Sequence, residues 1–376
     1  MLSLSDYDYS LPTHLIAQRL ASPADSCKFL VYDQKKLSHH AFHDISSLLK
    51  SNTQIWLNTS KVIKARILIP YLTGEIFFLH AHNDYEFDAL VRPGKKMKVG
   101  TTIKVDTFEF VVLENTDQWR RLRCSQPIMA VLEKIWHMPL PPYISYNKNK
   151  TDAYQPLQAK QEHLWSVAAP TASLHFTKEV LQGLKNKNCD FHETVLHIWL
   201  WTFKSVDVEH IEEYDIHAER IVIDIQDFNY IYTAKTQEKD ILGVWTTVTR
   251  TLETLPYIRI LLPKELKDGF ENNVYNHRQI LTDDITVVQA QKFVSDIYIW
   301  ENWIITANCR LYIYPGFRFR IINKLLTNFH LPKSSLLMLV AAFVGYEEMK
   351  KIYDEALAHE YKFFSFGDAM LLDIKK

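Results

Sequence analysis

Two ionisable side chains stand two residues apart in the segment DIHAER, where His217 and Glu219 flank an alanine. In an extended chain, residues at positions i and i+2 project to the same side, so both could face one ligand. An imidazole beside a carboxylate suits general acid–base catalysis near neutral pH. An ordinary surface pair explains the same spacing equally well, so the spacing alone leaves both interpretations open.

Three more histidines lie in hydrophobic stretches: His175 in TASLHF, His197 in VLHIWLWTF and His330 in TNFHLP. Each has a side chain that can transfer protons near pH 7, although a hydrogen-bonded core histidine is the commoner alternative. Asn328, in the same stretch as His330, could bind the edge of a nucleobase or hold a turn.

Arg250 and Glu253 are three residues apart in TTVTRTLE, which makes them neighbours on a helix. A structural ion pair is the favoured interpretation, and binding of a ligand carboxylate by Arg250 is the functional one. Asp368 in FGDAM is equally compatible with binding a ribose hydroxyl and with capping a local turn.

Basic residues gather in two short stretches, ALVRPGKKMKVG and FRFRIINK. Such clusters can neutralise nucleic-acid phosphates, while a solvated charged face is the usual alternative. The candidate phosphate-binding residues are Arg92, Lys95, Lys96, Lys98, Arg318 and Arg320.

Composition excludes several classes of protein. The 376 residues are 47% hydrophobic and 23% charged with a net charge of -1, which fits a globular protein of two domains rather than a disordered chain or a polycation. The four cysteines have no C-x-x-C spacing, so no zinc or redox motif is expected. No secretory signal is visible at the start and the longest apolar run, LLMLVAAFV, is too short to span a membrane. A cytoplasmic protein is expected.

The elements that must position these residues fall into two patterns. Six short β-rich runs between residues 67 and 124, separated by turn signals, predict a small antiparallel barrel or sandwich. The surrounding chain mixes helix and strand patterns, with an amphipathic helix over 347–360 and another beginning after Thr177, a plausible N-cap. The run LLMLVAAFV is expected to be a buried core segment.

Several dense blocks together resemble one family. They are LPTHLIAQ (11–18), NTSKVIKARI (58–67), HMPLPPYI (137–144), VAAPTASLHF (167–176), TNFHLP (327–332) and FFSFGDAM (363–370). In this order they closely resemble the S-adenosylmethionine:tRNA ribosyltransferase-isomerases of queuosine biosynthesis, over nearly the whole chain. The phosphate loop and the glycine-rich dinucleotide turn are absent, which counts against a methyltransferase with the usual nucleotide fold.

The resemblance implies an α/β main domain with an inserted six-stranded antiparallel β-barrel. We expect the main domain to comprise residues 1–64 and 147–376, and the barrel residues 65–146. It implies transfer and isomerisation of the ribosyl group of S-adenosylmethionine onto 7-aminomethyl-7-deazaguanine at the tRNA wobble position, with release of adenine and methionine. S-adenosylmethionine is then a consumed substrate, and neither a cofactor nor a metal is expected. The expected partner is a tRNA with a GUN anticodon, bound by a monomer without membrane contact.

The resemblance also assigns roles to candidate residues. The family has an H-S-E stretch at His217 and Glu219, and Arg250 would reach the methionine carboxylate. The expected catalytic residues are His175, His197, His217, Glu219 and His330. The expected substrate-binding residues are Thr171, Arg250, Tyr314, Asn328 and Asp368.

Five tryptophans stand where the family has glycine: Trp136, Trp165, Trp199, Trp201 and Trp245. Family glycines of this kind usually allow a tight turn or close approach to a ligand. We hypothesise that these positions are UGA codons that the organism reads as glycine, which would also explain why the chain has only 9 glycines. If the tryptophans are genuine, the alternative is a non-catalytic RNA-binding homologue.

Overall fold

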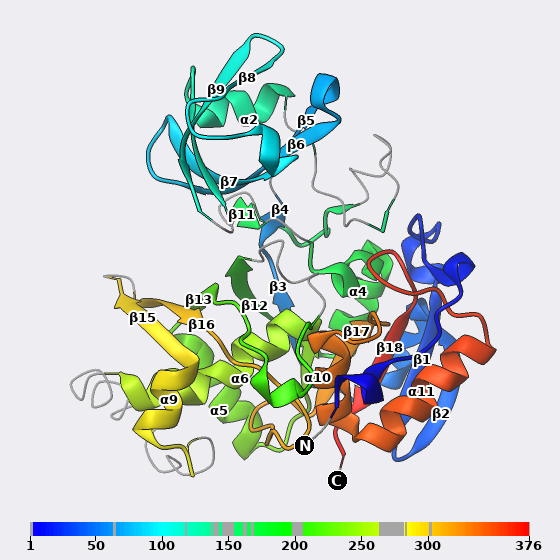
Figure 1. Cartoon of the computed structure of the whole chain (residues 1–376). Coiled ribbons are helices and arrows are strands. Elements are labelled where there is room, and N and C mark those ends of the chain that lie inside the picture. The colour runs from blue at the N-terminus through cyan, green and yellow to red at the C-terminus, as the bar shows by residue number, and fades with distance from the viewer. Residues whose placement is uncertain are drawn as a thin grey trace. The chain divides into compact units, whose positions relative to one another are not determined.

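The computed structural model divides the chain into two compact units (Figure 1). The larger comprises Met1–Lys61, Pro141–Leu164 and Ala169–Lys376, and the smaller Val62–Leu140 and Trp165–Ala168. The structure describes residues 3–62, 65–116, 119–135, 137, 143–144, 154–160, 164–166, 169–197, 206–262, 282, 284–300 and 303–375.

The larger unit is built on a ten-stranded mixed sheet with the order β15-β16-β13-β12-β3-β14-β17-β18-β1-β2. Its strands are β1 (Lys28–Asp33), β2 (Lys36–Ala41), β3 (Gln54–Asn58), β12 (Asp190–His197), β13 (Glu219–Asp224), β14 (Ile241–Val244), β15 (Val294–Ile299), β16 (Ile304–Cys309), β17 (Lys324–Asn328) and β18 (Ala369–Asp373). The four central neighbours β12, β3, β14 and β17 run parallel. Every residue of β3, β14 and β17 is buried, as expected of parallel strands covered on both faces.

Helices of the larger unit cover this sheet (Figure 1). They are α1 (Ile45–Leu48), α4 (Lys178–Asn186), α5 (Gln226–Thr236), α6 (Thr246–Leu261), α9 (Val287–Phe293), α10 (Ser335–Val344) and α11 (Tyr346–Ala358). Short 3-10 helices are η1 (Leu4–Tyr7), η2 (Thr13–Leu15), η3 (Ala24–Ser26), η4 (Phe42–Asp44), η9 (Thr171–His175) and η11 (Ile211–Glu213). Helix α6 packs against the parallel strands β3, β12, β14 and β17.

The predicted helices are confirmed. Thr177 caps α4 by accepting a hydrogen bond from the Val180 backbone N–H, and α11 buries Met349, Ile352, Tyr353 and Ala356. The apolar run forms α10, which is buried from Leu337 onwards. Within the described residues, no helix is both long and apolar enough to cross a bilayer.

The smaller unit is a six-stranded antiparallel sheet with the order β5-β6-β7-β10-β9-β8, which confirms the predicted barrel-like insert. Its elements are β5 (Arg66–Ile69), η5 (Pro70–Leu72), β6 (Gly74–Ala81), β7 (Glu86–Arg92), η6 (Gly94–Lys96), β8 (Thr102–Val105), β9 (Phe108–Asn115), β10 (Arg120–Cys124) and α2 (Ile128–Ile135). Two short strands, β4 (Lys61–Val62) and β11 (Leu164–Ser166), pair separately where the chain passes between the units.

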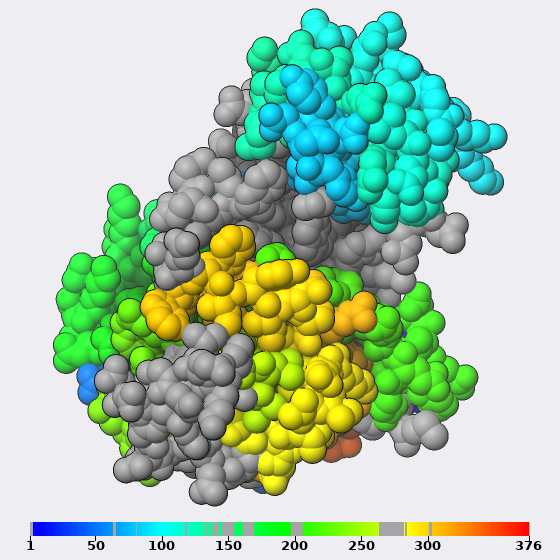
Figure 2. Space-filling model, turned by 90° about the vertical axis from the view of Figure 1, so that its left-hand side faces the viewer, coloured from blue at the N-terminus to red at the C-terminus, as the bar shows by residue number. Residues whose placement is uncertain are grey.

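The α9–β15 segment lies on the surface of the larger unit (Figure 2). Several large apolar side chains there face solvent, including Val288 on α9, Tyr298 on β15 and Trp300 just after it. Strand β15 is the last strand of the large sheet, and its burial alternates irregularly.

Candidate active site

One edge of the ten-stranded sheet gathers several of the predicted site residues. Because β12, β3, β14 and β17 are parallel, their carboxyl ends meet there, and ligands of α/β proteins usually bind at this end of the strands. Strands β13 and β18 run in the opposite direction and contribute their amino ends. We call this the polar edge, and its residues in sheet order are Glu219, His197, Asn58, Trp245, Asn328 and Asp368.

Asn328, the last residue of β17, holds a buried network at the polar edge. Its side-chain oxygen accepts a hydrogen bond from Thr171 Oγ1 at 2.7 Å, and its Nδ2 lies 3.2 Å from His175 Nε2. The same Nδ2 donates to the carbonyls of Gly367 and Asp368, both at 3.3 Å. The amide nitrogen is therefore fully engaged within the protein. The side chain joins Thr171, His175 and the two residues that precede β18.

His175 is fully buried, and burial lowers its pKa to about 4. The imidazole is therefore neutral at pH 7. Because the Asn328 amide nitrogen can only donate, Nε2 is the acceptor and Nδ1 carries the hydrogen. Nδ1 faces Cys27 Sγ at 3.3 Å and the Ala24 carbonyl at 3.4 Å.

A second network surrounds Glu219 at the start of β13. Its Oε2 lies 2.6 Å from Arg250 Nη1 on α6, and its Oε1 lies 3.3 Å from His217 Nε2. Glu219 is completely buried and Arg250 is 3% exposed. The predicted His217–Glu219 proximity is confirmed, and Arg250 joins the pair to make a triad.

Arg250 retains an unused donor in this triad. Its Nε donates to the Leu311 carbonyl at 3.1 Å, but Nη2 is buried without a hydrogen-bond partner. Arg250 and His217 line one small cavity together with Ser335 of α10 and several apolar side chains. A buried, unsatisfied guanidinium nitrogen is costly. The cavity has a volume of about 10 Å³, which is room for about one oxygen atom, so a single carboxylate oxygen reaching into it would satisfy Nη2.

The favoured ion pair between Arg250 and Glu253 is wrong. The Glu253 carboxylate instead accepts backbone N–H groups of Arg320, Ile321 and Ile322 at 2.8, 2.9 and 2.9 Å. Burial is the main effect on Glu253 and raises the pKa of its carboxyl. The helical spacing predicted a contact within one helix, but Arg250 pairs with Glu219 and Glu253 accepts from the backbone of another segment.

His330 follows β17 by two residues and is buried, with partners outside the triad. Its Nε2 lies 3.0 Å from Thr327 Oγ1, its backbone N–H donates to the Tyr353 hydroxyl at 3.0 Å, and its carbonyl accepts from Tyr9. Burial lowers the pKa of His330 to about 3, so this imidazole is also neutral at pH 7.

Asp368 ties the start of β1 to the turn before β18. Its two carboxylate oxygens accept the backbone N–H groups of Lys28 at 2.8 Å and Lys362 at 2.7 Å. Burial outweighs these bonds and raises the pKa of the carboxyl. These two hydrogen bonds agree with the interpretation of Asp368 as a residue that caps a local turn.

The remaining predicted residues belong to neither network in the part of the chain that the structure describes. His197 ends β12 beside Arg220, and its side chain lies outside the described residues. Tyr314 packs against Tyr312 with ring centroids 5.0 Å apart. Arg318 is exposed and pairs with Asp284 at 2.9 Å, whereas Arg320 is partly buried. The basic residues at the end of β7 and between β7 and β8 of the smaller unit are all exposed: Arg92, Lys95, Lys96 and Lys98.

Trp245 connects β14 to α6 with φ 80° and ψ 157°. Residues other than glycine avoid this region, so the backbone has the conformation that a glycine at this position would adopt. The Trp245 side chain is only 2% exposed. Of the other tryptophans at family glycine positions, Trp136, Trp199 and Trp201 lie outside the described residues, as does the side chain of Trp165.

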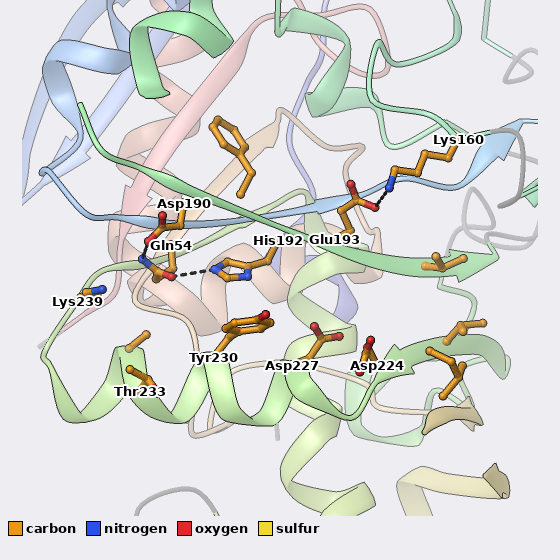
Figure 3. Close-up of a pocket in the computed structure, with 15 residues that line it drawn as sticks. Gln54, Lys160, Asp190, His192, Glu193, Asp224, Asp227, Tyr230, Thr233 and Lys239 are labelled. Atoms are coloured by element: carbon orange, nitrogen blue, oxygen red, sulfur yellow. Dashed lines mark hydrogen bonds and ion pairs between the residues drawn. The ribbon is translucent and has the colours of Figure 1, made fainter. Parts of the chain in front are cut away.

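A larger cavity of about 890 Å³ lies between β12 and α5 and contains none of the predicted residues (Figure 3). Gln54 links Asp190 and His192 through hydrogen bonds of 2.7 and 2.8 Å, and Lys160 pairs with Glu193 at 2.6 Å. Asp227 lines the same cavity, and burial with nearby Asp224 raises its pKa to about 8. The sequence offered no signal for it, because these residues come from four separate segments.

The fold and the site together define an α/β protein with a small antiparallel barrel and a candidate active site at the polar edge. A sequence model of the family described as Queuosine biosynthesis protein matches residues 4–372. The chain therefore belongs to this family.

Two full-length relatives carry the same name. A protein of Thermotoga petrophila named S-adenosylmethionine:tRNA ribosyltransferase-isomerase is 35% identical, covering 99% of this chain and 100% of its own. One of the same name from Thermosipho africanus is 36% identical with the same coverage. The crystal structure of an S-adenosylmethionine tRNA ribosyltransferase from Thermotoga maritima is 29% identical with a TM-score of 0.50, covering 98% of this chain and 99% of that one.

Proposed function

We propose that this chain is an S-adenosylmethionine:tRNA ribosyltransferase-isomerase. It transfers and isomerises the ribosyl group of S-adenosylmethionine onto 7-aminomethyl-7-deazaguanine at the tRNA wobble position. The products are epoxyqueuosine in the tRNA, adenine and methionine. Family membership and the name of the full-length relatives support this reaction.

The unsatisfied Arg250 Nη2 is the observation that carries the proposal. S-adenosylmethionine bears a carboxylate on its methionine part, and a guanidinium nitrogen is a strong donor to such a group. Arg250 is held in place by Glu219 and the Leu311 carbonyl, which leaves Nη2 for the ligand. This residue therefore anchors the methionine end of the substrate.

His217 is our candidate for the base that removes the C5′ proton next to the sulfonium. It lines the same cavity as Arg250, and Glu219 stabilises the imidazolium that forms when it accepts a proton. His175 and His330 are weaker bases because burial depresses their pKa values. We assign Asn328 to positioning His175, since its amide nitrogen lies against His175 and two backbone carbonyls and its oxygen accepts from Thr171.

The second substrate is a tRNA with a GUN anticodon. The exposed basic residues between β7 and β8 offer cationic side chains to its phosphates. S-adenosylmethionine is consumed in the reaction, so it acts as a substrate and not as a cofactor. We place the reaction in the cytoplasm and propose a monomeric enzyme.

The test is product analysis with tRNA carrying the aminomethyl-deazaguanine and radiolabelled S-adenosylmethionine. We expect free adenine and methionine in equal amounts, with the ribosyl label on the tRNA. A methyltransferase would instead leave S-adenosylhomocysteine, and an RNA-binding homologue would leave the substrate intact. Either of these results would overturn the proposal.

Arg250→Lys tests the anchoring role. Lysine is chosen because its positive charge still pairs with buried Glu219, whereas an unpaired buried carboxylate would destabilise the fold. Lysine lacks the second nitrogen with which the guanidinium could bind the substrate. We expect the KM for S-adenosylmethionine to rise about tenfold or more, while exposed Arg310→Lys leaves it unchanged. An unchanged KM in Arg250→Lys would show that Arg250 does not bind this substrate.

A further inference from the structure

Three potential metal ligands converge on the outside of the larger unit, apart from the polar edge. His39 lies on β2, Glu355 on α11, and His359 directly follows that helix. Their nearest ligand atoms all lie within 4.8 Å of one another. Glu355 Oε1 is central, at 3.1 Å from His39 Nε2 and 3.2 Å from His359 Nδ1.

These distances match the coordination shell of a small ion. A tetrahedral Zn²⁺ with bonds of about 2.0–2.1 Å keeps its ligand atoms roughly 3.3–3.5 Å apart. The two distances to Glu355 Oε1 are only slightly shorter. The third distance, between His39 Nε2 and His359 Nδ1, is at most 4.8 Å. His359 Nδ1 also lies 3.1 Å from the Glu355 carbonyl oxygen, so its ring must turn from that carbonyl, and the side chains must move by a few tenths of an ångström, to admit the ion.

The helix and the neighbouring tyrosine pre-arrange the ligands. Glu355 and His359 are four residues apart, which places both on one face at the end of α11. His39 Nδ1 lies 2.8 Å from the Tyr361 hydroxyl, leaving Nε2 directed at Glu355. A partner on the second ring nitrogen is how metal-binding histidines are usually oriented.

The ligand types select the class of ion. Two imidazoles and one carboxylate suit borderline transition metals, whereas Mg²⁺ and Ca²⁺ prefer sets of oxygen atoms. His39 and His359 are exposed and Glu355 is partly exposed, so solvent can supply the remaining ligand. A three-residue set with a water-filled position is a common zinc arrangement.

We propose that His39, Glu355 and His359 form a binding site for a divalent transition-metal ion such as Zn²⁺. The ion fastens β2, the edge strand at the opposite end of the sheet from β15, to the end of α11. The same region is tied to the polar edge, since Lys28 Nζ donates to the His359 carbonyl at 2.7 Å and the Lys28 N–H donates to Asp368. The site is structural and takes no part in the proposed reaction.

The experiment is a zinc titration of the full-length, metal-stripped chain against a chromophoric chelator. We expect one high-affinity Zn²⁺ per chain, and a rise in melting temperature on adding zinc, because binding to the folded state stabilises it. His39→Ala and His359→Ala should each weaken binding by about tenfold or more and abolish the zinc-dependent rise. Circular dichroism of the metal-free variants verifies that they fold.

His40→Ala is the matched control. His40 is the next residue on β2, is partly exposed, and its Nε2 bonds to Ser38, so its loss should leave zinc binding unchanged. Replacing zinc by Co²⁺ should give the visible bands of a four-coordinate ion in native protein and His40→Ala only. No binding by the native chain, or equal binding by folded His39→Ala and His359→Ala, would overturn the proposal.

Discussion

At the scale of single residues, Trp245 combines a strained backbone with a buried indole. Its φ of 80° and ψ of 157° cost a non-glycine residue about 1–3 kcal/mol. At the same time the indole fills space beside the carboxyl end of β14, and removing it would leave a void. Comparing two small substitutions separates these opposing effects.

Trp245→Gly and Trp245→Ala both remove the indole, but only glycine also relieves the backbone. We expect the free energy of unfolding of Trp245→Gly to exceed that of Trp245→Ala by about 1–3 kcal/mol. Urea denaturation of the two variants measures the difference. An alanine variant as stable as the glycine variant would show that the position does not favour glycine.

Asp227 gives the protein a distinctive pH dependence. An aspartate in an unfolded chain has a pKa of about 3.9, whereas burial raises the pKa of Asp227 to about 8. Between these values the folded chain keeps a proton that the unfolded chain releases. The free energy of unfolding must therefore fall as pH rises through this window.

Asp227→Asn should remove this fall, which over the whole window has an upper limit of about 6 kcal/mol. Urea denaturation between about pH 5 and pH 9 provides the measurement. The control is Asp354→Asn, an exposed aspartate on α11, which should follow the native curve. If the free energy of unfolding depends on pH in the same way in Asp227→Asn and in the native chain, the pKa of Asp227 is not raised in the folded state.

At the scale of elements, the turn before β18 depends on a close approach of two backbone segments. A Cβ on Gly367 would lie 2.5 Å from the Lys362 carbonyl oxygen and 2.6 Å from the Phe363 carbonyl carbon. The Gly367 carbonyl also accepts from Asn328, and Asp368 holds Lys28 and Lys362. Both ends of this turn therefore support the network around His175.

Gly367→Ala should destabilise the fold by about 1–3 kcal/mol, because the contact is with backbone that cannot move aside easily. Gly94→Ala is the control, since its Cβ would meet only Arg120 Nη2 at 3.6 Å. Thermal melting compares the two. A Gly367→Ala chain as stable as Gly94→Ala would show that the turn can open without loss.

At the scale of the whole molecule, charge is nearly balanced, with a net value of -1. Binding of a polyanion must then rely on local clusters and not on overall attraction. The basic residues between β7 and β8 are exposed and close together in sequence, so they are the best local candidates in the smaller unit.

Lys95→Ala/Lys96→Ala should weaken tRNA binding and reduce its salt dependence. Each lost phosphate contact lowers the slope of log Kd against log salt by roughly 0.7–0.9. The control is Lys350→Ala/Lys351→Ala, which removes the same charge from exposed positions on α11. Filter binding at several salt concentrations checks this, and equal slopes for the two double variants would refute the assignment.

Local sequence patterns predicted the helices and strands more accurately than they predicted the contacts between side chains. The six short β-rich runs of the insert became β5 to β10, and Thr177 caps α4 as predicted. The i, i+2 spacing of His217 and Glu219 also predicted a real contact. The prediction of an Arg250–Glu253 ion pair was wrong because helical spacing gives each residue several possible neighbours. A buried charged group pairs with the groups that best satisfy its hydrogen bonds, and these lie in other segments.

The sequence by itself determined the element types, the inserted sheet and the family, because periodicity, turn residues and ordered blocks depend on residues close together in the chain. Only the tertiary structure decided that β13, β14 and β17 bring Glu219, Trp245 and Asn328 to one edge. It also decided that His175 is neutral and that His39 meets Glu355, 316 residues away. Burial and long-range contact arise when distant segments pack, and no local pattern encodes them.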